Sequence, residues 1–342
     1  MEWQKIREQA REKLQGICRL CPNCDGRACA GEIPGMGGVG TGSSFINNYE
    51  ALRKVRLNLS ALHSITDPAL EVEIFGRTLA LPVLGAAVAG ARINFQGRIS
   101  EEEFCLSQVK GAQVAGTVAL TGDGGHKELF AAGIKAAKTV GGATIPIIKP
   151  RPVPDIVARV REAEEAGVMA VGIDVDAAGL VNMRLLGQPV LPLAPEKLAE
   201  ICESTQLPVV VKGIMTADDA LLALEAGASA IVVSNHGGRA LDHTPGTAEV
   251  LPEIARAIQG RLTVLADGGV RSGTDILKVL ALGADAVLVG RPLVWAAVGG
   301  GAKGVRMLYE QLASELKVAM ILTGCSNPQE AGMWLLAPNK CC

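Results

Sequence analysis

The sequence predicts an α/β protein in which eight strand–helix units close into a (β/α)8 TIM barrel, preceded by a Cys/Gly-rich extension. Two observations carry this prediction. Short apolar runs alternate with helical patterns along most of the chain, and from residue 207 to residue 291 every run ends in polar or glycine residues. Runs without polar alternation suit strands that are buried on both faces, as parallel strands are.

The elements follow one another regularly along the chain. Trp3–Leu14 is expected to form a helix before the barrel. The expected strands are Pro82–Ala87, Val114–Ala119, Ala143–Lys149, Val168–Asp174, Leu207–Lys212, Ser229–Asn235, Leu262–Asp267 and Ala284–Arg291. The expected barrel helices include Ser100–Lys110, Lys127–Thr139, Asp155–Ala166, Ala217–Ala226 and Thr274–Leu282, with a last helix from about 302 to 323.

Eight repeats in strict alternation favour a closed parallel barrel. The alternative is an open doubly wound sheet, but the Gly-x-Gly-x-x-Gly turn expected after its first strand is absent. We expect three parts: residues 1–60 as an N-terminal segment packed on the barrel, 61–330 as the barrel, and 331–342 as an irregular tail.

Composition narrows the class of protein. Of 342 residues, 49% are apolar and 20% charged, and the net charge of −2 gives no basic excess for binding nucleic acid. No apolar run reaches the roughly 18 residues that a membrane span needs. The first fifteen residues are charged, unlike a secretory signal. Together with nine cysteines, this predicts a protein of the reducing cytoplasm.

Four cysteines gather near the N-terminus, at Cys18, Cys21, Cys24 and Cys29. Their spacing could hold one Zn²⁺ or an iron–sulfur cluster, although the last interval is one residue longer than in the bacterial ferredoxin pattern. The third alternative is a reduced cysteine-rich loop without metal. We favour a structural metal over a redox cluster. The following segment, Gly31–Gly42, is too glycine-rich for a helix or strand, and we expect a lid or ligand-contacting loop rather than a merely mobile one.

The loops after the seventh and eighth strands predict a phosphate site. They contain Asp267, Gly268, Gly269 and Arg271, and then Gly290 with Arg291. Glycines let the backbone approach an anion closely, arginines neutralise its charge, and barrels commonly bind phosphate at this position.

The loops after the middle strands predict acid–base chemistry. Lys212 ends an apolar strand, and its ammonium group is expected at the barrel mouth beside an electron-rich ligand or a buried carboxylate. His236 and Arg239 share the next loop and suit a base beside a carboxylate anchor. Asp174 could orient the histidine or simply cap a helix.

These motifs resemble the FMN-dependent α-hydroxy-acid oxidase/dehydrogenase family, which includes glycolate and lactate oxidases. The resemblance rests on Lys212-Gly213, on 234–242 (SNHGGRALD), on 267–275 (DGGVRSGTD) and on Gly290-Arg291-Pro292, and it extends over roughly four-fifths of the chain. It implies that the phosphate is that of FMN and that the substrate is a small 2-hydroxy acid. We also expect a homo-oligomer, a tetramer or larger.

The resemblance also implies residue roles. Lys212 would stabilise the anionic reduced flavin, and Ser234 would contact its ring. His236 would take a substrate proton, Arg239 would grip the substrate carboxylate, and Asp174 would orient His236. We further expect flavin contacts from Ala87 and Thr117, in the first two strands.

The chain departs from the family pattern on the substrate side. The only tyrosines are Tyr49 and Tyr309, so the family's two site tyrosines are not matched, and Thr144 and Pro146 stand where a glutamine and a tyrosine are usual. This indicates an intact flavin site beside an altered substrate pocket. The alternatives are an FMN-dependent isomerase of the type 2 isopentenyl diphosphate isomerase kind, a flavin-binding protein without turnover, and a barrel enzyme of unrelated chemistry.

Overall fold

Residues 2–338 of the computed structural model describe the fold, and eight parallel strands form a closed barrel in the order β10-β3-β4-β5-β6-β7-β8-β9. The prediction of a (β/α)8 barrel is therefore confirmed, and the open sheet is excluded. The strands are β3 (Val83–Val88), β4 (Ala119–Gly122), β5 (Thr144–Ile148), β6 (Val171–Asp174), β7 (Val209–Ile214), β8 (Ala230–Val233), β9 (Thr263–Ala266) and β10 (Ala286–Val289).

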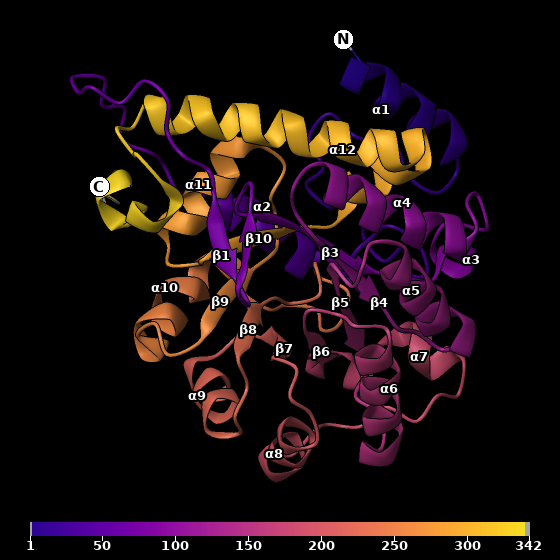
Figure 1. The fold of residues 1–342 in the computed structure, drawn as a ribbon. Helices are drawn as coiled ribbons and strands as arrows, with labels where there is room; N and C mark the ends of the chain where they lie inside the picture. Colours follow the sequence, from indigo (N-terminus) through magenta and orange to yellow (C-terminus); the bar gives the residue numbers. More distant parts are fainter. Residues whose placement is uncertain (1, 339–342) are drawn as a thin grey trace.

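A helix follows each strand and covers the outside of the barrel (Figure 1). These helices are α4 (Glu101–Val114), α5 (Lys127–Thr139), α6 (Val153–Glu165), α8 (Pro195–Glu203), α9 (Ala217–Glu225), α10 (Thr247–Ile258), α11 (Gly273–Ala281) and α12 (Arg291–Ile321). Most barrel strands are buried along their whole length, which explains why their sequences are uniformly apolar. Gly300 and Gly301 interrupt α12 with non-helical backbone angles, so the helix predicted from about 302 is its second half.

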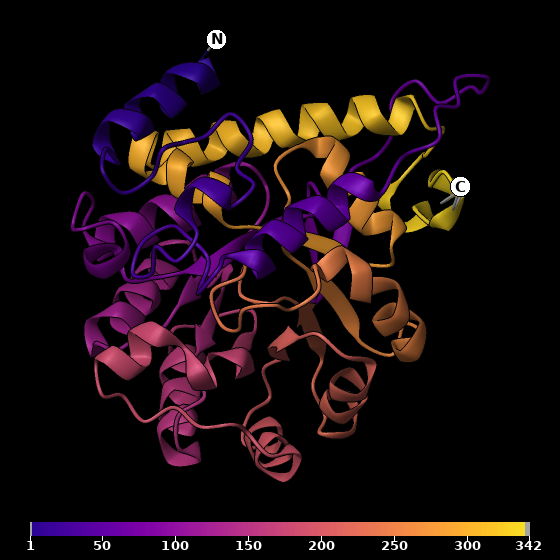
Figure 2. The same ribbon diagram turned by 180° about the vertical axis from the view of Figure 1, so that it is seen from behind.

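Several smaller elements lie outside the repeat. α1 (Glu2–Lys13) packs along α12, and α2 (Ser43–Lys54) packs on α10. The others are the hairpin of β1 (Val72–Ile74) and β2 (Arg77–Leu79), α3 (Ala91–Asn94), α7 (Val181–Leu185), and the short helices η1 (Arg27–Cys29), η2 (Val175–Gly179), η3 (Pro328–Glu330) and η4 (Met333–Leu335). The hairpin lies in front of the barrel in Figure 1, whereas the N-terminal segment and α2 lie in front in the reverse view of Figure 2.

The second strand differs from its prediction. Val114–Ala119 was expected, but α4 continues to Val114, and β4 begins only at Ala119. Gly116, with a φ of 76°, makes the turn between them. The apolar run misled the prediction because apolar residues at a helix end and in a buried strand look alike over a few positions.

Within residues 2–338, no helix is both long enough and apolar enough to cross a membrane. The division into residues 1–60, 61–330 and 331–342, the homo-oligomeric assembly and the cytoplasmic location stay predictions.

Candidate active site

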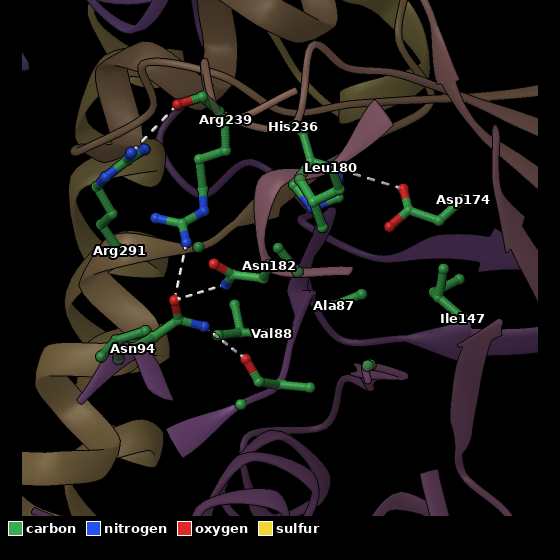
Figure 3. Close-up of a pocket in the computed structure, with 18 of the residues that line it drawn as sticks. Ala87, Val88, Asn94, Ile147, Asp174, Leu180, Asn182, His236, Arg239 and Arg291 are labelled. Atoms are coloured by element: carbon green, nitrogen blue, oxygen red, sulfur yellow. Dashed lines mark hydrogen bonds and ion pairs between the residues drawn. The ribbon is translucent and has the colours of Figure 1, made fainter. Parts of the chain in front are cut away.

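The carboxyl ends of the strands surround one open cavity of about 1260 Å³, counted to its mouth. Because all strands run the same way, side chains at their ends meet at one face of the barrel even though they are far apart in sequence. Those lining the cavity include Lys149, Asp174, Lys212, His236, Arg239, Asp267, Arg271 and Arg291. Figure 3 shows several of them pointing into the same space.

Asp174 is the centre of a buried ion-pair network. Its two carboxylate oxygens lie 2.9 Å from Lys212 Nζ and 2.6 Å from Lys149 Nζ, and all three side chains are buried. Burial alone would raise the pKa of Asp174, but His236 and the two ammonium groups outweigh it and hold the pKa well below its usual range. For Lys212, burial opposes protonation, yet the facing aspartates outweigh it and raise its pKa. Asp174 and Lys212 therefore remain charged.

His236 is held by a carboxylate that the sequence analysis did not name. Its Nδ1 lies 3.0 Å from Asp176 Oδ1, in a hydrogen bond, and 3.5 Å from Asp174 Oδ1. A carboxylate only accepts, so in the neutral form of the imidazole Nδ1 carries the proton and Nε2 has the lone pair. That Asp174 orients His236 stays a prediction: Asp174 bonds to the two lysines and lies farther from Nδ1, whereas Asp176, on the short helix η2, makes the closer contact.

The backbone at His236 adopts a left-handed conformation with a φ of 59°, followed by Gly237 at 63° and Gly238 at 78°. A Cβ on Gly238 would lie 2.3 Å from the Phe45 backbone nitrogen, so only glycine allows α2 to pack this closely. The turn projects the imidazole into the cavity, and the His236 N–H donates to Ser234 Oγ at 3.1 Å. The His-Gly-Gly sequence is thus explained by backbone geometry as well as by chemistry.

Asp174, Asp176 and His236 are the only group of three or more potential ligands close enough to share a metal ion within residues 2–338. Two ammonium groups already neutralise Asp174. A cation there would meet two lysines at close range, so the geometry is that of an oriented base rather than of a metal centre.

The four N-terminal cysteines consequently do not form the predicted metal site in this structure. Cys24 Sγ accepts a hydrogen bond from Arg271 at 3.5 Å, and Cys29 Sγ donates to the Gly26 carbonyl at 3.8 Å. Burial raises the pKa of Cys29 to about 11. Within residues 2–338 the four cysteines do not lie close enough together to share a metal ion, so zinc and an iron–sulfur cluster are both unsupported.

The loops after β9 and β10, where an anion site was predicted, both line the cavity. Gly268 and Gly269 have φ angles of 98° and 79°, and a Cβ on Gly269 would lie 2.5 Å from the Asn48 carbonyl. Helix α12 begins at Arg291, so its first N–H groups, apart from that missing at Pro292, lack partners inside the helix. Two guanidinium groups and a helix N-terminus thus converge on the same end of the cavity.

These residues fit FMN. Asp267 Oδ1 has no hydrogen-bond partner among residues 2–338, and its Oδ2 accepts from Ser234 Oγ at 2.9 Å, so the free oxygen suits a ligand hydroxyl. A Cβ on Gly290 would find no atom closer than 3.8 Å, which leaves room for a phosphate beside it. The small side chains of Ala86 and Ala87 leave a slot for a flat ring. Phosphate, hydroxyl and ring contacts are all available in one cavity.

Arg239 and Arg291 are held mainly by backbone carbonyls of the glycine-rich segment. Arg239 donates to the Gly35 carbonyl at 2.6 Å, and Arg291 donates to the Met36 and Gly37 carbonyls at 3.0 and 3.2 Å. Arg291 also stacks on Phe45, with 3.5 Å between its guanidinium carbon and the ring centroid. Burial lowers the pKa of both guanidiniums to about 10, so they stay protonated at neutral pH.

The glycine-rich segment thus lines the cavity, and only glycine can stand at 37, where a Cβ would lie 2.0 Å from the Cys29 carbonyl. The segment is fastened to the loop after β8, where Asp242 accepts hydrogen bonds from Thr41 and Ser43. Contact with a ligand stays a prediction for this segment.

Two residues that are expected to contact the flavin, Thr117 and Ser234, do not line the cavity in this structure. Thr117 lies before β4, away from the cavity, and donates to the Val83 carbonyl at 2.6 Å, because the strand begins later than predicted. Ser234 is fully buried beneath the cavity and holds Asp267 and the His236 backbone. Ala87 does line the cavity.

Four site residues were missed from the sequence: Lys149, Asn94 and Asn182, which line the cavity, and Asp176, which bonds to His236. Lys149 directly follows an apolar strand, the same signal that identified Lys212, and could have been found. Asn94 and Asn182 carry no such signal, because they come from the short helices α3 and α7. Asn94 Oδ1 accepts from Arg239 at 2.9 Å and from Asn182 Nδ2 at 3.1 Å (Figure 3).

Comparison with known proteins agrees with this geometry. The family model described as FMN-dependent dehydrogenase matches residues 35–185 and 184–337. The chain is 36% identical to 4-hydroxymandelate oxidase of Amycolatopsis orientalis, over 88% of this chain and 93% of that protein. It is 31% identical to 2-hydroxyacid oxidase 1 of Homo sapiens, over 88% and 90% of the two chains. A crystal structure of mandelate oxidase with (S)-2-phenylpropionate superposes with a TM-score of 0.78 at 34% identity, over 98% of this chain and 97% of that one.

The chain therefore belongs to the FMN-dependent dehydrogenase family. It is an FMN-dependent enzyme of the 2-hydroxy-acid oxidase/dehydrogenase type.

Proposed function

We propose that this enzyme oxidises a small 2-hydroxy acid to the 2-oxo acid, with His236 as the base and Arg239 as the carboxylate clamp. The observation that carries the proposal is the hydrogen bond between His236 Nδ1 and Asp176, which leaves Nε2 able to accept a proton inside the cavity. FMN, when bound, supplies the acceptor for the two electrons that leave the C2–H bond.

The protein side of the reaction then follows from the residues. Oxidation turns the C2–O single bond into a carbonyl, so the substrate loses one proton and one hydride equivalent. His236 takes the hydroxyl proton or, where the C2–H bond is described as breaking first, the proton on C2; in both descriptions one proton ends on Nε2. The adjacent Asp176 stabilises the imidazolium that forms.

Arg239 supplies the positive charge for the substrate carboxylate. Gly35 and Asn94 hold it from two sides without neutralising it, since both partners are uncharged. Lys212 supplies a positive charge for the reduced, anionic cofactor, and the loops with Asp267, Arg271 and Arg291 hold its hydroxyls and phosphate.

Anaerobic mixing of the FMN-loaded protein with a panel of 2-hydroxy acids tests the proposal. At least one acid is expected to bleach the flavin absorbance and to yield its 2-oxo acid in equal amount. His236→Ala should slow this reduction by at least about 10²-fold while FMN stays bound, the usual scale for loss of a general base. The matched control is His126→Ala, an exposed histidine outside the cavity, which should leave the rate unchanged.

Equal rates for His236→Ala and the wild type would overturn the assignment of the base. A panel in which no acid reduces the flavin would overturn the proposed reaction. Turnover of a diphosphate without net redox change would instead indicate an isomerase.

A further inference from the structure

Lys149 has no role in the proposed reaction, although it lies at the floor of the cavity. Three neighbouring strands present Lys149, Asp174 and Lys212 in a row: Lys149 directly follows β5, Asp174 ends β6, and Lys212 lies in β7. Both lysines line the cavity, and Asp174 stands between them. One carboxylate thus faces two ammonium groups.

The position of Lys149 is fixed at both ends of the residue. Its backbone N–H donates to Asp123 Oδ2 at 3.1 Å, and Asp123 is itself ion-paired with Arg151 at 3.2 Å. Its Nζ lies 2.6 Å from Asp174 Oδ2, and only 8% of its side chain is exposed. Lys149 is therefore a buried cation held in one place, not a surface lysine that happens to reach the site.

The carboxylates around Lys212 explain why a second cation is needed at the floor of the cavity to favour further negative charge there. Asp174, Asp176 and Asp267 all act on Lys212. With Lys212 alone, three carboxylates would face one ammonium group, and the local field would oppose any further negative charge. Lys149 offsets part of that field from the neighbouring strand.

Both ammonium groups also keep hydrogen-bond capacity for a ligand. An ammonium group has three N–H donors. Within residues 2–338, Asp174 is the one side-chain acceptor bonded to either Nζ. The remaining donors belong to groups that line the cavity in which the cofactor fits.

We infer that Lys149 is a second cofactor-facing cation, which acts with Lys212 to stabilise the negative charge that enters bound FMN on reduction. The inference rests on the FMN site and not on the substrate or on the roles of His236 and Arg239. Its chemistry is electrostatic: a fixed ammonium group in a partly water-excluded cavity favours the form of the ligand that carries more negative charge.

Sulfite binding to the oxidised holoenzyme tests the inference without any substrate. Sulfite donates its electron pair to the oxidised flavin and so places negative charge on the ring. Lys149→Gln is expected to weaken sulfite binding by at least about tenfold, and to lower the two-electron midpoint potential of bound FMN by about 30 mV for each tenfold change in the equilibrium. Both are read from the flavin spectrum.

Matched variants separate this role from a structural one. Lys149→Arg keeps the charge and should restore sulfite affinity to within about threefold of the wild type. Lys135→Gln, which removes an exposed lysine on α5, should not change it. If Lys149→Gln does not bind FMN, Lys149→Met is measured instead, by the same change in sulfite affinity. Its side chain is of similar length and has no unpaired polar group.

The inference is overturned if an FMN-loaded, folded Lys149→Gln or Lys149→Met protein binds sulfite within about twofold of the wild type, since Lys149 would then only neutralise Asp174. Sulfite affinity and midpoint potential can be measured even if no 2-hydroxy acid is oxidised. A failure of the inference is therefore distinct from a failure of the proposed function.

Discussion

The two sides of the cavity hold their charged groups in different ways. On the side formed by β5, β6 and β7, Lys149 and Lys212 are paired with the carboxylate of Asp174. On the opposite side, Arg239 and Arg291 are bonded to uncharged carbonyl oxygens of residues 35–37. On the first side a carboxylate lies between the two cations before any ligand arrives, whereas on the second side the hydrogen-bond partners named here are uncharged.

This difference predicts whether a substitution on each side of the cavity acts on the stability of the protein or on ligand binding. Removing one partner of a buried ion pair leaves an uncompensated charge, which costs much more than the loss of a neutral hydrogen bond. Ion-pair disruption should therefore act on stability, and changes on the guanidinium side should act on ligand binding.

The largest effect is expected from Asp174→Asn. The substitution removes the carboxylate that is hydrogen-bonded to both buried ammonium groups and should lower the free energy of unfolding by about 3–5 kcal/mol, measured by urea denaturation. Glu102→Gln, which removes the exposed partner of Lys135, is the control and should cost less than about 1 kcal/mol. Comparable losses in the two variants would contradict the distinction between the two sides.

The difference in stability between the wild type and Asp174→Asn should depend on pH in a defined way. The pKa of Asp174 in the folded protein lies below the unfolded value of about 3.9, so its stabilising contribution is fully present above that value and is lost as the pH falls through the folded-state pKa. The stability gap between wild type and Asp174→Asn should therefore stay constant from about pH 5 to pH 8 and shrink only at more acidic pH. A gap that closes near neutral pH would mean that Asp174 is not the group responsible.

Asp176→Asn, on the same loop as Asp174, should impair catalysis and leave stability nearly unchanged. Asp176 bonds to His236 and not to the lysines, so its loss should slow flavin reduction by at least about 10²-fold and cost little stability. Stopped-flow reduction and urea denaturation of one preparation measure both. If Asp176→Asn is as fast as the wild type, Asp174 is the orienting carboxylate after all.

Arg291→Ala is expected to act on cofactor retention. Loss of charge-assisted contacts to a phosphate corresponds to about 1.5–3 kcal/mol, so FMN affinity should fall roughly 10- to 100-fold while riboflavin affinity changes little. Fluorescence titration of the flavin-free protein measures both, and Arg271→Ala should behave similarly. Equal wild-type affinity for FMN and riboflavin would contradict the phosphate site.

The smallest effect is expected from Asn94→Leu. Asn94 contacts Arg239 with an uncharged oxygen, so its removal should weaken binding of 2-oxo acids by about tenfold or less, consistent with one hydrogen bond to a charged group. Flavin difference spectra report this binding without turnover. Asn94→Gln keeps an uncharged carboxamide acceptor and should recover part of the affinity, whereas an equal loss in both variants would show that the Asn94 carboxamide acts on something other than Arg239.

The sequence by itself determined the barrel and most of its reactive side. Uniformly apolar runs separated by helical patterns fixed the parallel strands, and a polar residue directly after such a run, as at Lys212 or Asp267, must lie at the mouth. The glycine pairs marked the phosphate loops, because only a backbone without side chains can approach an anion so closely. These inferences need only local pattern and the common direction of the strands.

Tertiary structure alone decided which groups meet. Asp176 rather than Asp174 alone faces His236 because η2 turns back, and the carbonyls of residues 35–37 reach Arg239 and Arg291 across some 200 positions of sequence. The cysteine spacing allowed a metal site, but the folded segment turns its thiols toward Arg271 and Gly26 instead. Spacing along a chain limits what can come together locally, whereas long-range contacts depend on packing that no short pattern records.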